Sequence, residues 1–276
     1  KLTLTQRAHL MLASCFGNQF HLLHLKEVMG KDFVQTAILD LDRAGYFLEK
    51  SITSRVFSHT LVRETIYRMI PSRVRRKSHK KISGVLERAL SEDVHPEYSV
   101  VADHYSLAGE KKKSLEFSNL AADQLFHQCS FHEASKYYER TYDLLKFTRD
   151  HKKWDIAHRL VMARMKSGKV FDALTLSKRI RKLLRKKDPV EYKNQFLLAQ
   201  FDCMEKLGKY SYINSAEKML SAIHKDYYDQ LLYLIGVAHF RHGDFDQARR
   251  CFEIIVSKRS EERRVGKECR SRCSPY

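Results

Sequence analysis

The sequence is short of the residues that interrupt helices, with four prolines and ten glycines among 276 residues. A β-sandwich or barrel needs turn residues roughly every 10 positions, whereas the long Leu, Ala, Lys, Arg and Glu stretches favour helices. No apolar run approaches the roughly 18 residues of a membrane-spanning helix. The chain opens with Lys1, Leu2 and Thr3, without an initiator methionine or a secretory segment. We therefore expect an all-α, cytoplasmic fragment of a longer protein, with no membrane span.

Motifs of enzymes are missing as well. The chain has no Gly-x-x-x-x-Gly-Lys-Ser/Thr, Gly-x-Gly-x-x-Gly, His-Glu-x-x-His or Gly-x-Ser-x-Gly. Two histidine pairs, His21 with His24 and His239 with His242, have the i, i+3 spacing that can share a metal, but no Cys or carboxylate cluster completes either pair. The sequence thus predicts no catalytic residue, no metal and no cofactor within this chain.

The six cysteines do not predict a disulfide framework. Four of them, Cys15, Cys129, Cys203 and Cys251, stand singly within helical patterns, where a free cysteine behaves as a small buried hydrophobe. The other two belong to residues 259–276, which lack an apolar period and resemble the adapter-derived read-through at the ends of some conceptual translations. We expect this tail to be unstructured.

The formal net charge of +18 raises the question of a polyanionic partner. The Lys and Arg residues are spread along the chain, with dense runs near the start of one expected helix and at the end of another. Solvated helix faces and favourable charges near helix ends are therefore the preferred interpretation, with a nucleic-acid or membrane surface as the alternative.

The first 95 residues follow the order helix, helix, helix, hairpin. Apolar residues recur at helical spacing in three segments, residues 3–16, 22–29 and 33–43. Two short apolar runs, 46–48 and 56–58, flank a polar turn and predict a small hairpin or wing. A further helix opens between Phe57 and Tyr67 and ends at Pro71, and another restarts near Ser78. His59 lies where strand meets helix, a place that favours packing or capping over proton transfer.

Residues 96–258 carry a degenerate repeat of helical hairpins. Gly236, Gly243, Ala248 and Phe252 occupy the small and large positions of a tetratricopeptide hairpin. Small residues let two antiparallel helices approach, Gly243 makes the turn, and Phe252 fills the gap towards the next repeat. Looser copies carry Gly168 with Ala173, and Tyr105 with Gly109. The sequence predicts a winged-helix-like module over 1–95, followed by an α-solenoid of tetratricopeptide-type hairpins over 96–258.

An ordered set of short motifs also resembles a known family. The set is Leu4-Thr5-Gln6-Arg7, Ala13-Ser14-x-x-Gly17-x-x-Phe20, Leu41-x-x-Ala44-Gly45, Phe57-x-His59-x-Leu61-x-Arg63-Glu64-x-Ile66-Tyr67, Arg76-x-x-His79 and Asp103-His104-Tyr105-x-x-Ala108-Gly109. It resembles the region after the ATPase core in signal-transduction ATPases with numerous domains, and among these the carboxyl-terminal half of soluble (type 10) adenylyl cyclases. The resemblance implies a winged-helix module that packs on an upstream ATPase, and an arm of hairpins. The catalytic domains of such proteins would precede Lys1.

Three functions follow from these patterns. The first is a non-catalytic regulatory region that binds a protein, a peptide or the upstream domains of its parent. The second is a winged-helix nucleic-acid-binding transcriptional regulator, whose reading helix would be 33–41. This helix and its flank carry Asp32 and Asp40 against Lys31, which disfavours contact with phosphates. The third is an enzyme fragment that holds part of an active site.

Overall fold

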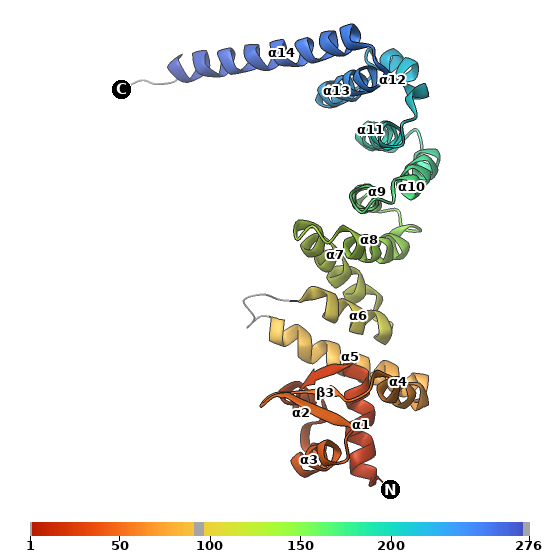
Figure 1. The fold of residues 1–276 in the computed structure, drawn as a ribbon, viewed down its shortest axis with the longest axis vertical. Coiled ribbons are helices and arrows are strands. Elements are labelled where there is room, and N and C mark those ends of the chain that lie inside the picture. The colour runs from red at the N-terminus through yellow and green to blue at the C-terminus, as the bar shows by residue number, and fades with distance from the viewer. Residues whose placement is uncertain (1, 91–96, 273–276) are drawn as a thin grey trace. The chain divides into compact units, whose positions relative to one another are not determined.

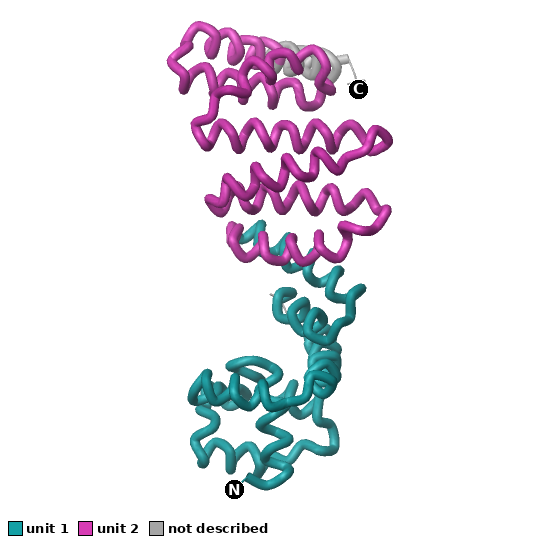
Figure 2. The backbone as a smooth tube through the Cα atoms, turned by 90° about the vertical axis from the view of Figure 1, so that its right-hand side faces the viewer, with its two compact units in different colours: residues 1–128 teal, residues 129–276 magenta. Residues whose placement is uncertain are grey.

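The structure is a computed structural model that describes residues 2–90 and 97–272, and over 259–272 the backbone alone. Contacts divide the chain into two compact units, Lys1–Gln128 and Cys129–Tyr276, which Figure 2 colours teal and magenta. The boundary expected near residues 91–96 lies outside the described residues, so the division into 1–95 and 96–258 stays a prediction.

The first unit begins with helices and a small sheet (Figure 1). Its opening elements are α1 Leu4–Phe16, β1 Gln19–His21, α2 Leu22–Met29, η1 Gly30–Asp32, α3 Gln35–Arg43, β2 Phe47–Ser51 and β3 Ser54–Phe57. A capping box starts α1, because Thr3 accepts from the Gln6 backbone while the Gln6 side chain accepts from Thr3. The strands form an antiparallel sheet in the order β1-β3-β2. β1 was not predicted, because three residues are too few to show an alternating pattern.

Three phenylalanines meet in the core of this part, among buried aliphatic side chains. Phe20, Phe47 and Phe57 come one from each strand, and their ring centroids lie 4.9–6.3 Å apart. Arg55 on β3 is 5% exposed and donates through Nε to Asp42 of α3 at 2.9 Å, while its Nη1 donates to the carbonyls of Ser51 and Ser54. This buried pair joins the sheet to α3.

Four further helices complete the described part of the first unit. They are α4 Thr60–Met69, α5 Ser72–Leu90, α6 Tyr98–Ala108 and α7 Lys111–His127. α5 begins six residues before the predicted restart at Ser78. Pro71 accounts for the difference: it ends α4, yet its carbonyl accepts from Val74 and Arg75 and so opens α5, as proline does in a first turn. α6 packs against both α5 and α7.

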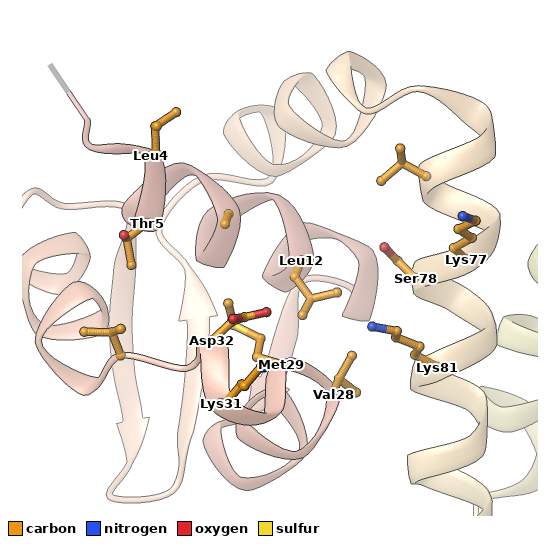
Figure 3. Close-up of a pocket in the computed structure, with 13 residues that line it drawn as sticks. Leu4, Thr5, Leu12, Val28, Met29, Lys31, Asp32, Lys77, Ser78 and Lys81 are labelled. Atoms are coloured by element: carbon orange, nitrogen blue, oxygen red, sulfur yellow. The ribbon is translucent and has the colours of Figure 1, made fainter.

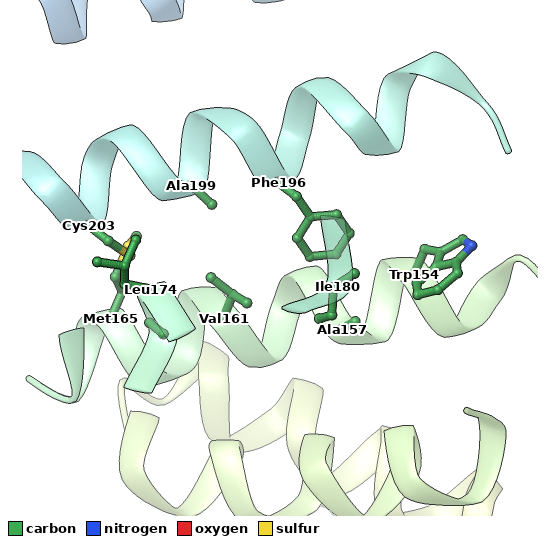
Figure 4. Packing of buried hydrophobic residues seen from close by; sticks show 10 residues of the cluster. Trp154, Ala157, Val161, Met165, Leu174, Ile180, Phe196, Ala199 and Cys203 are labelled. Atoms are coloured by element: carbon green, nitrogen blue, oxygen red, sulfur yellow. The ribbon is translucent and has the colours of Figure 1, made fainter. Parts of the chain in front are cut away.

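The second unit is a stack of antiparallel helices (Figure 2). Its elements are α8 Phe131–Leu145, α9 Lys152–Lys166, α10 Val170–Leu183, α11 Val190–Lys206, η2 Tyr210–Tyr212, α12 Ile213–Met219, α13 Lys225–His242 and α14 Phe245–Arg272. Figure 4 shows one of its cores, where Trp154 and Val161 of α9 meet Ile180 of α10 and Phe196 of α11. Each helix therefore buries one face against its sequence neighbours, which is the packing of a repeat array.

The tail prediction needs a correction. Residues 259–276 were expected to be unstructured, but α14 continues as far as Arg272, and residues 273–276 lie outside the described residues. Within residues 259–272, nine of the 14 positions are Arg, Lys or Glu and one is glycine, so the helix propensity is high even without an apolar period.

Candidate interaction surfaces

The predicted motif residues of the first unit occupy structural positions. Phe57 is buried in the aromatic core, and His59 is exposed at the start of α4, where its side chain makes no capping bond. Tyr105 is buried and donates its hydroxyl proton to Glu87, which also accepts from Lys113 at 2.7 Å. Gly109 ends α6 in the left-handed conformation, with φ at 80°.

Tyr67 is hydrogen-bonded to a buried pair of histidines, His79 and His104. Its hydroxyl lies 2.9 Å from Nε2 of His79, and Nδ1 of His79 lies 2.9 Å from Nδ1 of His104. The ring of His104 also bonds to the backbone of Phe16, a contact that favours its charged form and so identifies the carbonyl as acceptor. This chain of bonds joins α4, α5, α6 and α1.

One set of proton positions satisfies all of these hydrogen bonds. A carbonyl only accepts, so His104 donates to Phe16 and keeps Nδ1 as an acceptor for the Nδ1–H of His79. Nε2 of His79 then accepts the Tyr67 proton. Burial lowers the pKa of both histidines to about 4, with Arg75 adding to the effect at His79. Both rings are therefore neutral near pH 7. Their arrangement favours a structural role for the pair over a catalytic one.

The repeat positions of the second unit lie where helices meet. Ala173 and Ala248 are buried, and Gly168 and Gly243 make turns with φ of 83° and 91°. Gly236 faces the hairpin partner so closely that a Cβ there would lie 2.8 Å from Cε1 of Phe252. Phe252 therefore fills space over Gly236 within its own hairpin, where the sequence suggested a role towards the next repeat.

Sequence reasoning missed a turn residue at Cys129. It was assigned to a helical pattern and expected to be buried, but it is exposed with φ at 60°, the one positive value of a non-glycine residue in the described chain. Cys129, Gly168, Gly208 and Gly243 follow at intervals of 39, 40 and 35 residues. Counting back one period from Gly168 would have found the position.

An apolar groove lies on the hairpin of α13 and α14. It has a volume of about 690 Å³ and is lined chiefly by Phe240 of α13 and by Phe245, Phe252 and Val256 of α14; we call it the α13–α14 groove. Phe240, Phe245 and Val256 are 57%, 62% and 67% exposed. Large apolar side chains gathered in the open are typical of contact surfaces.

A second groove lies in the first unit, between α1, α2 with η1, and α5 (Figure 3). Its volume is about 700 Å³, and we call it the α1–α5 groove. Leu12, Val28 and Met29 form its apolar floor, while Lys77 and Lys81 lie on the α5 side. Nothing in the sequence indicated this groove, because its α5 wall begins 40 residues after the last lining residue of the other walls, Val34.

Other chemistry is sparse in the described part of the chain. No group of three His, Cys, Asp or Glu side chains is placed to hold a metal within residues 2–90 and 97–258. The rings of His21 and His24 lie 5.5 Å apart without such a third member, and His239 pairs instead with Glu217 at 2.9 Å. Among the described helices, none has the length and apolarity to span a membrane.

Comparison with known proteins gives little beyond the structure itself. No protein-family model matches the chain, and no curated protein matches it. Among solved structures, it is similar to a signal-transduction ATPase with numerous domains from Pyrococcus horikoshii that has a tetratricopeptide repeat sensor, at 14% identity and a TM-score of 0.42. The match covers 93% of this chain and 44% of that chain, so this chain spans less than half the length of that protein.

Proposed function

We propose that the chain is a non-catalytic, protein-binding regulatory region of a larger cytoplasmic signalling ATPase or adenylyl cyclase-like protein. The observation that carries the proposal is the α13–α14 groove, an exposed apolar surface built on a packed helical hairpin. Stacked hairpins supply a rigid frame for such a surface, and a peptide or a protein helix can bury the three exposed side chains.

The order of elements in the amino-terminal part supports the proposal of a winged-helix module. α1, β1, α2, α3, β2 and β3 follow one another, the sheet order is β1-β3-β2, and we assign the hairpin of β2 and β3 as the wing. We assign residues 1–95 to this module and 96–258 to the tetratricopeptide-like repeats. In this arrangement the module is a packing element for the upstream domains of the parent.

The nucleic-acid alternative finds no support at α3. The one cation of this helix is Arg43, whose Nη1 lies 3.7 Å from Asp40, and Asp42 of the same helix holds the buried Arg55. A helix with two carboxylates along its length repels phosphates. We therefore keep protein binding as the function.

Capture of proteins from a cytosolic extract tests the proposal, with the full chain immobilised at physiological salt. The test variant is Phe240→Ser with Phe245→Ser, which removes two exposed rings and leaves the hairpin core intact. We expect specific partners on the wild-type chain and a loss of at least about tenfold on the variant, because exposed aromatic anchors dominate such interfaces.

The matched control is Phe147→Ser. Phe147 is 90% exposed in the same unit but lies outside the groove, so this variant should capture the same partners as the wild type. Turnover of ATP by the purified chain alone would overturn the proposal. Equal capture by the wild type and both variants would show that the α13–α14 groove is not the surface that binds the partners.

A further inference from the structure

Two large apolar side chains of the α1–α5 groove are open to water. Leu4 is 83% exposed and Val74 is 45% exposed, and both line the groove beside the partly covered Leu12 and Met29. Their burial by a ligand would remove apolar surface from water, which is the main driving force of association.

The rim of the groove is cationic on its α5 side. Lys31 lies on the η1 wall, and Lys77 and Lys81 lie one helical turn apart on the α5 wall (Figure 3). None of the three has an ion-pair partner among residues 2–90 and 97–258. Asp32 is the one carboxylate among the lining residues. Lys31 and Asp32 therefore offset each other on the η1 wall, and the excess of positive charge lies on the α5 wall beside an apolar strip.

The shape of the site selects a helix as its occupant. The walls are helices α1, α2 and α5 with the short η1, so no free strand edge lines the groove and a partner cannot add to it as a strand. A helix with a leucine stripe fits the floor, and acidic residues on the flank that faces α5 meet Lys77 and Lys81.

We propose that the α1–α5 groove is a docking site for an acidic amphipathic helix of a partner protein. The site belongs to the first unit and is independent of the α13–α14 groove. This docking site is a second binding surface for a second kind of ligand, beyond the function proposed above.

The test uses the full chain and a labelled synthetic peptide with leucines at i, i+3, i+4 and i+7 and glutamates on the flank that would face α5. Fluorescence anisotropy measures the binding of this peptide. We expect saturable binding that weakens as salt is added. Lys77→Glu with Lys81→Glu should weaken binding at least about tenfold, because two attractive rim charges become repulsive. A peptide with lysines in place of the glutamates should bind this variant better than it binds the wild type.

A matched control separates the groove from overall charge. Lys111→Glu with Lys112→Glu makes the same charge change on α7, outside the groove, and should alter binding less than about threefold. Leu4→Ser with Val74→Ser should weaken the glutamate peptide without changing its salt dependence. Circular dichroism checks that each variant is folded.

Other outcomes overturn the inference. Equal affinity of the Lys77→Glu/Lys81→Glu variant and the wild type would sink it, and so would equal weakening by the α7 control. Groove-dependent binding of phosphatidylserine vesicles without binding of the peptide would assign the site to a lipid surface instead. The Phe240→Ser/Phe245→Ser variant should bind the peptide normally, so that failure here and failure of the proposed function remain distinct.

Discussion

The Nδ1 atoms of His79 and His104 lie 2.9 Å apart in the middle of the first unit, where both side chains are almost fully buried. A bond between two imidazole nitrogens needs one ring to donate and the other to accept, so a proton added to the accepting nitrogen breaks it. The pair joins α5 to α6, and the bonds of Tyr67 and Phe16 extend the connection to α4 and α1. The packing of four helices therefore depends on two neutral rings.

We expect the first unit to lose stability in acid. Burial lowers the pKa of both histidines from 6.5 to about 4, so between these pH values the unfolded chain binds protons that the folded chain does not. The contribution of the pair to the free energy of unfolding should thus be constant above about pH 6.5 and fall as the pH drops towards 4, by on the order of 3 kcal/mol for each histidine. Urea denaturation followed by circular dichroism at a series of pH values measures this.

The second unit provides an internal control. Trp154 is the one tryptophan of the chain and lies in that unit, so its fluorescence should show a weaker acid dependence than circular dichroism. His104→Gln should lower stability at pH 7 by about 1 kcal/mol and flatten the dependence between pH 6.5 and 4. His59→Gln, which changes an exposed ring, should leave both unaltered. The same pH profile in His104→Gln and wild type would rule out the pair as its cause.

Sequence patterns predicted the local structure of the first unit because that structure follows local signals. Capping at Thr3, the break at Gly17 and the hairpin around Phe57 each depend on residues within a few positions of one another. The repeat positions Gly236 and Gly243 also follow from spacing within a single hairpin. The structure places an αL turn at Gly243 and close helix contact at Gly236, as those residue types suggest.

Contacts between side chains on different helices and strands could not be predicted from the sequence in the same way. His79 and His104 stand 25 residues apart on different helices, and no periodicity says that their rings meet. Cys129 has no turn propensity, so only the repeat period points to its conformation. The α1–α5 groove depends on how α5 packs beside α1 and α2, which is a tertiary property.

Cys129→Gly should stabilise the second unit. An L-residue in the left-handed region costs about 1–2 kcal/mol, and glycine avoids this cost while it loses about 0.5–1 kcal/mol through the greater freedom of the unfolded chain. We expect a net gain of about 0.5–1 kcal/mol, measured as a higher urea midpoint of Trp154 fluorescence. Cys129→Ala keeps the strained φ and should gain nothing, so an equal gain in both variants would contradict the explanation.

Tyr105→Phe should cost the first unit about 1 kcal/mol, the usual contribution of one hydrogen bond. The cost stays modest because Glu87 keeps its bond from Lys113, and is not left without a partner. Burial raises the pKa of Glu87, but the bonds from Lys113 and Tyr105 outweigh it and hold that pKa below its usual value. Removal of the tyrosine hydroxyl should therefore raise the pKa of Glu87, which carbon-13 NMR of the labelled carboxyl can follow. Tyr233→Phe, at a 55% exposed site, is the control, and no shift at Glu87 would exclude the bond.

Gly236→Ala tests whether close approach of α13 and α14 requires glycine. In a helix interior alanine is better than glycine by about 1 kcal/mol, so the substitution would stabilise a helix with free space. Here the new Cβ would lie 2.8 Å from Cε1 of Phe252 and 3.1 Å from Cβ of Cys251, and the overpacking should outweigh that gain. We expect a net loss of about 1 kcal/mol in the urea unfolding of Trp154 fluorescence.

Gly84→Ala in α5 is the matched control, because the same substitution should raise stability there. Its Cβ would meet nothing nearer than Nη1 of Arg88 at 3.9 Å, so helix propensity acts alone and the first unit should gain up to about 1 kcal/mol. Phe252→Leu removes the ring atoms that the new methyl group meets, and should therefore cost less in the Gly236→Ala background than in the wild type. Additive stability changes of Gly236→Ala and Phe252→Leu would contradict this explanation, and so would stabilisation by both Gly236→Ala and Gly84→Ala. In either case, contact with Phe252 would not be the reason that position 236 requires glycine.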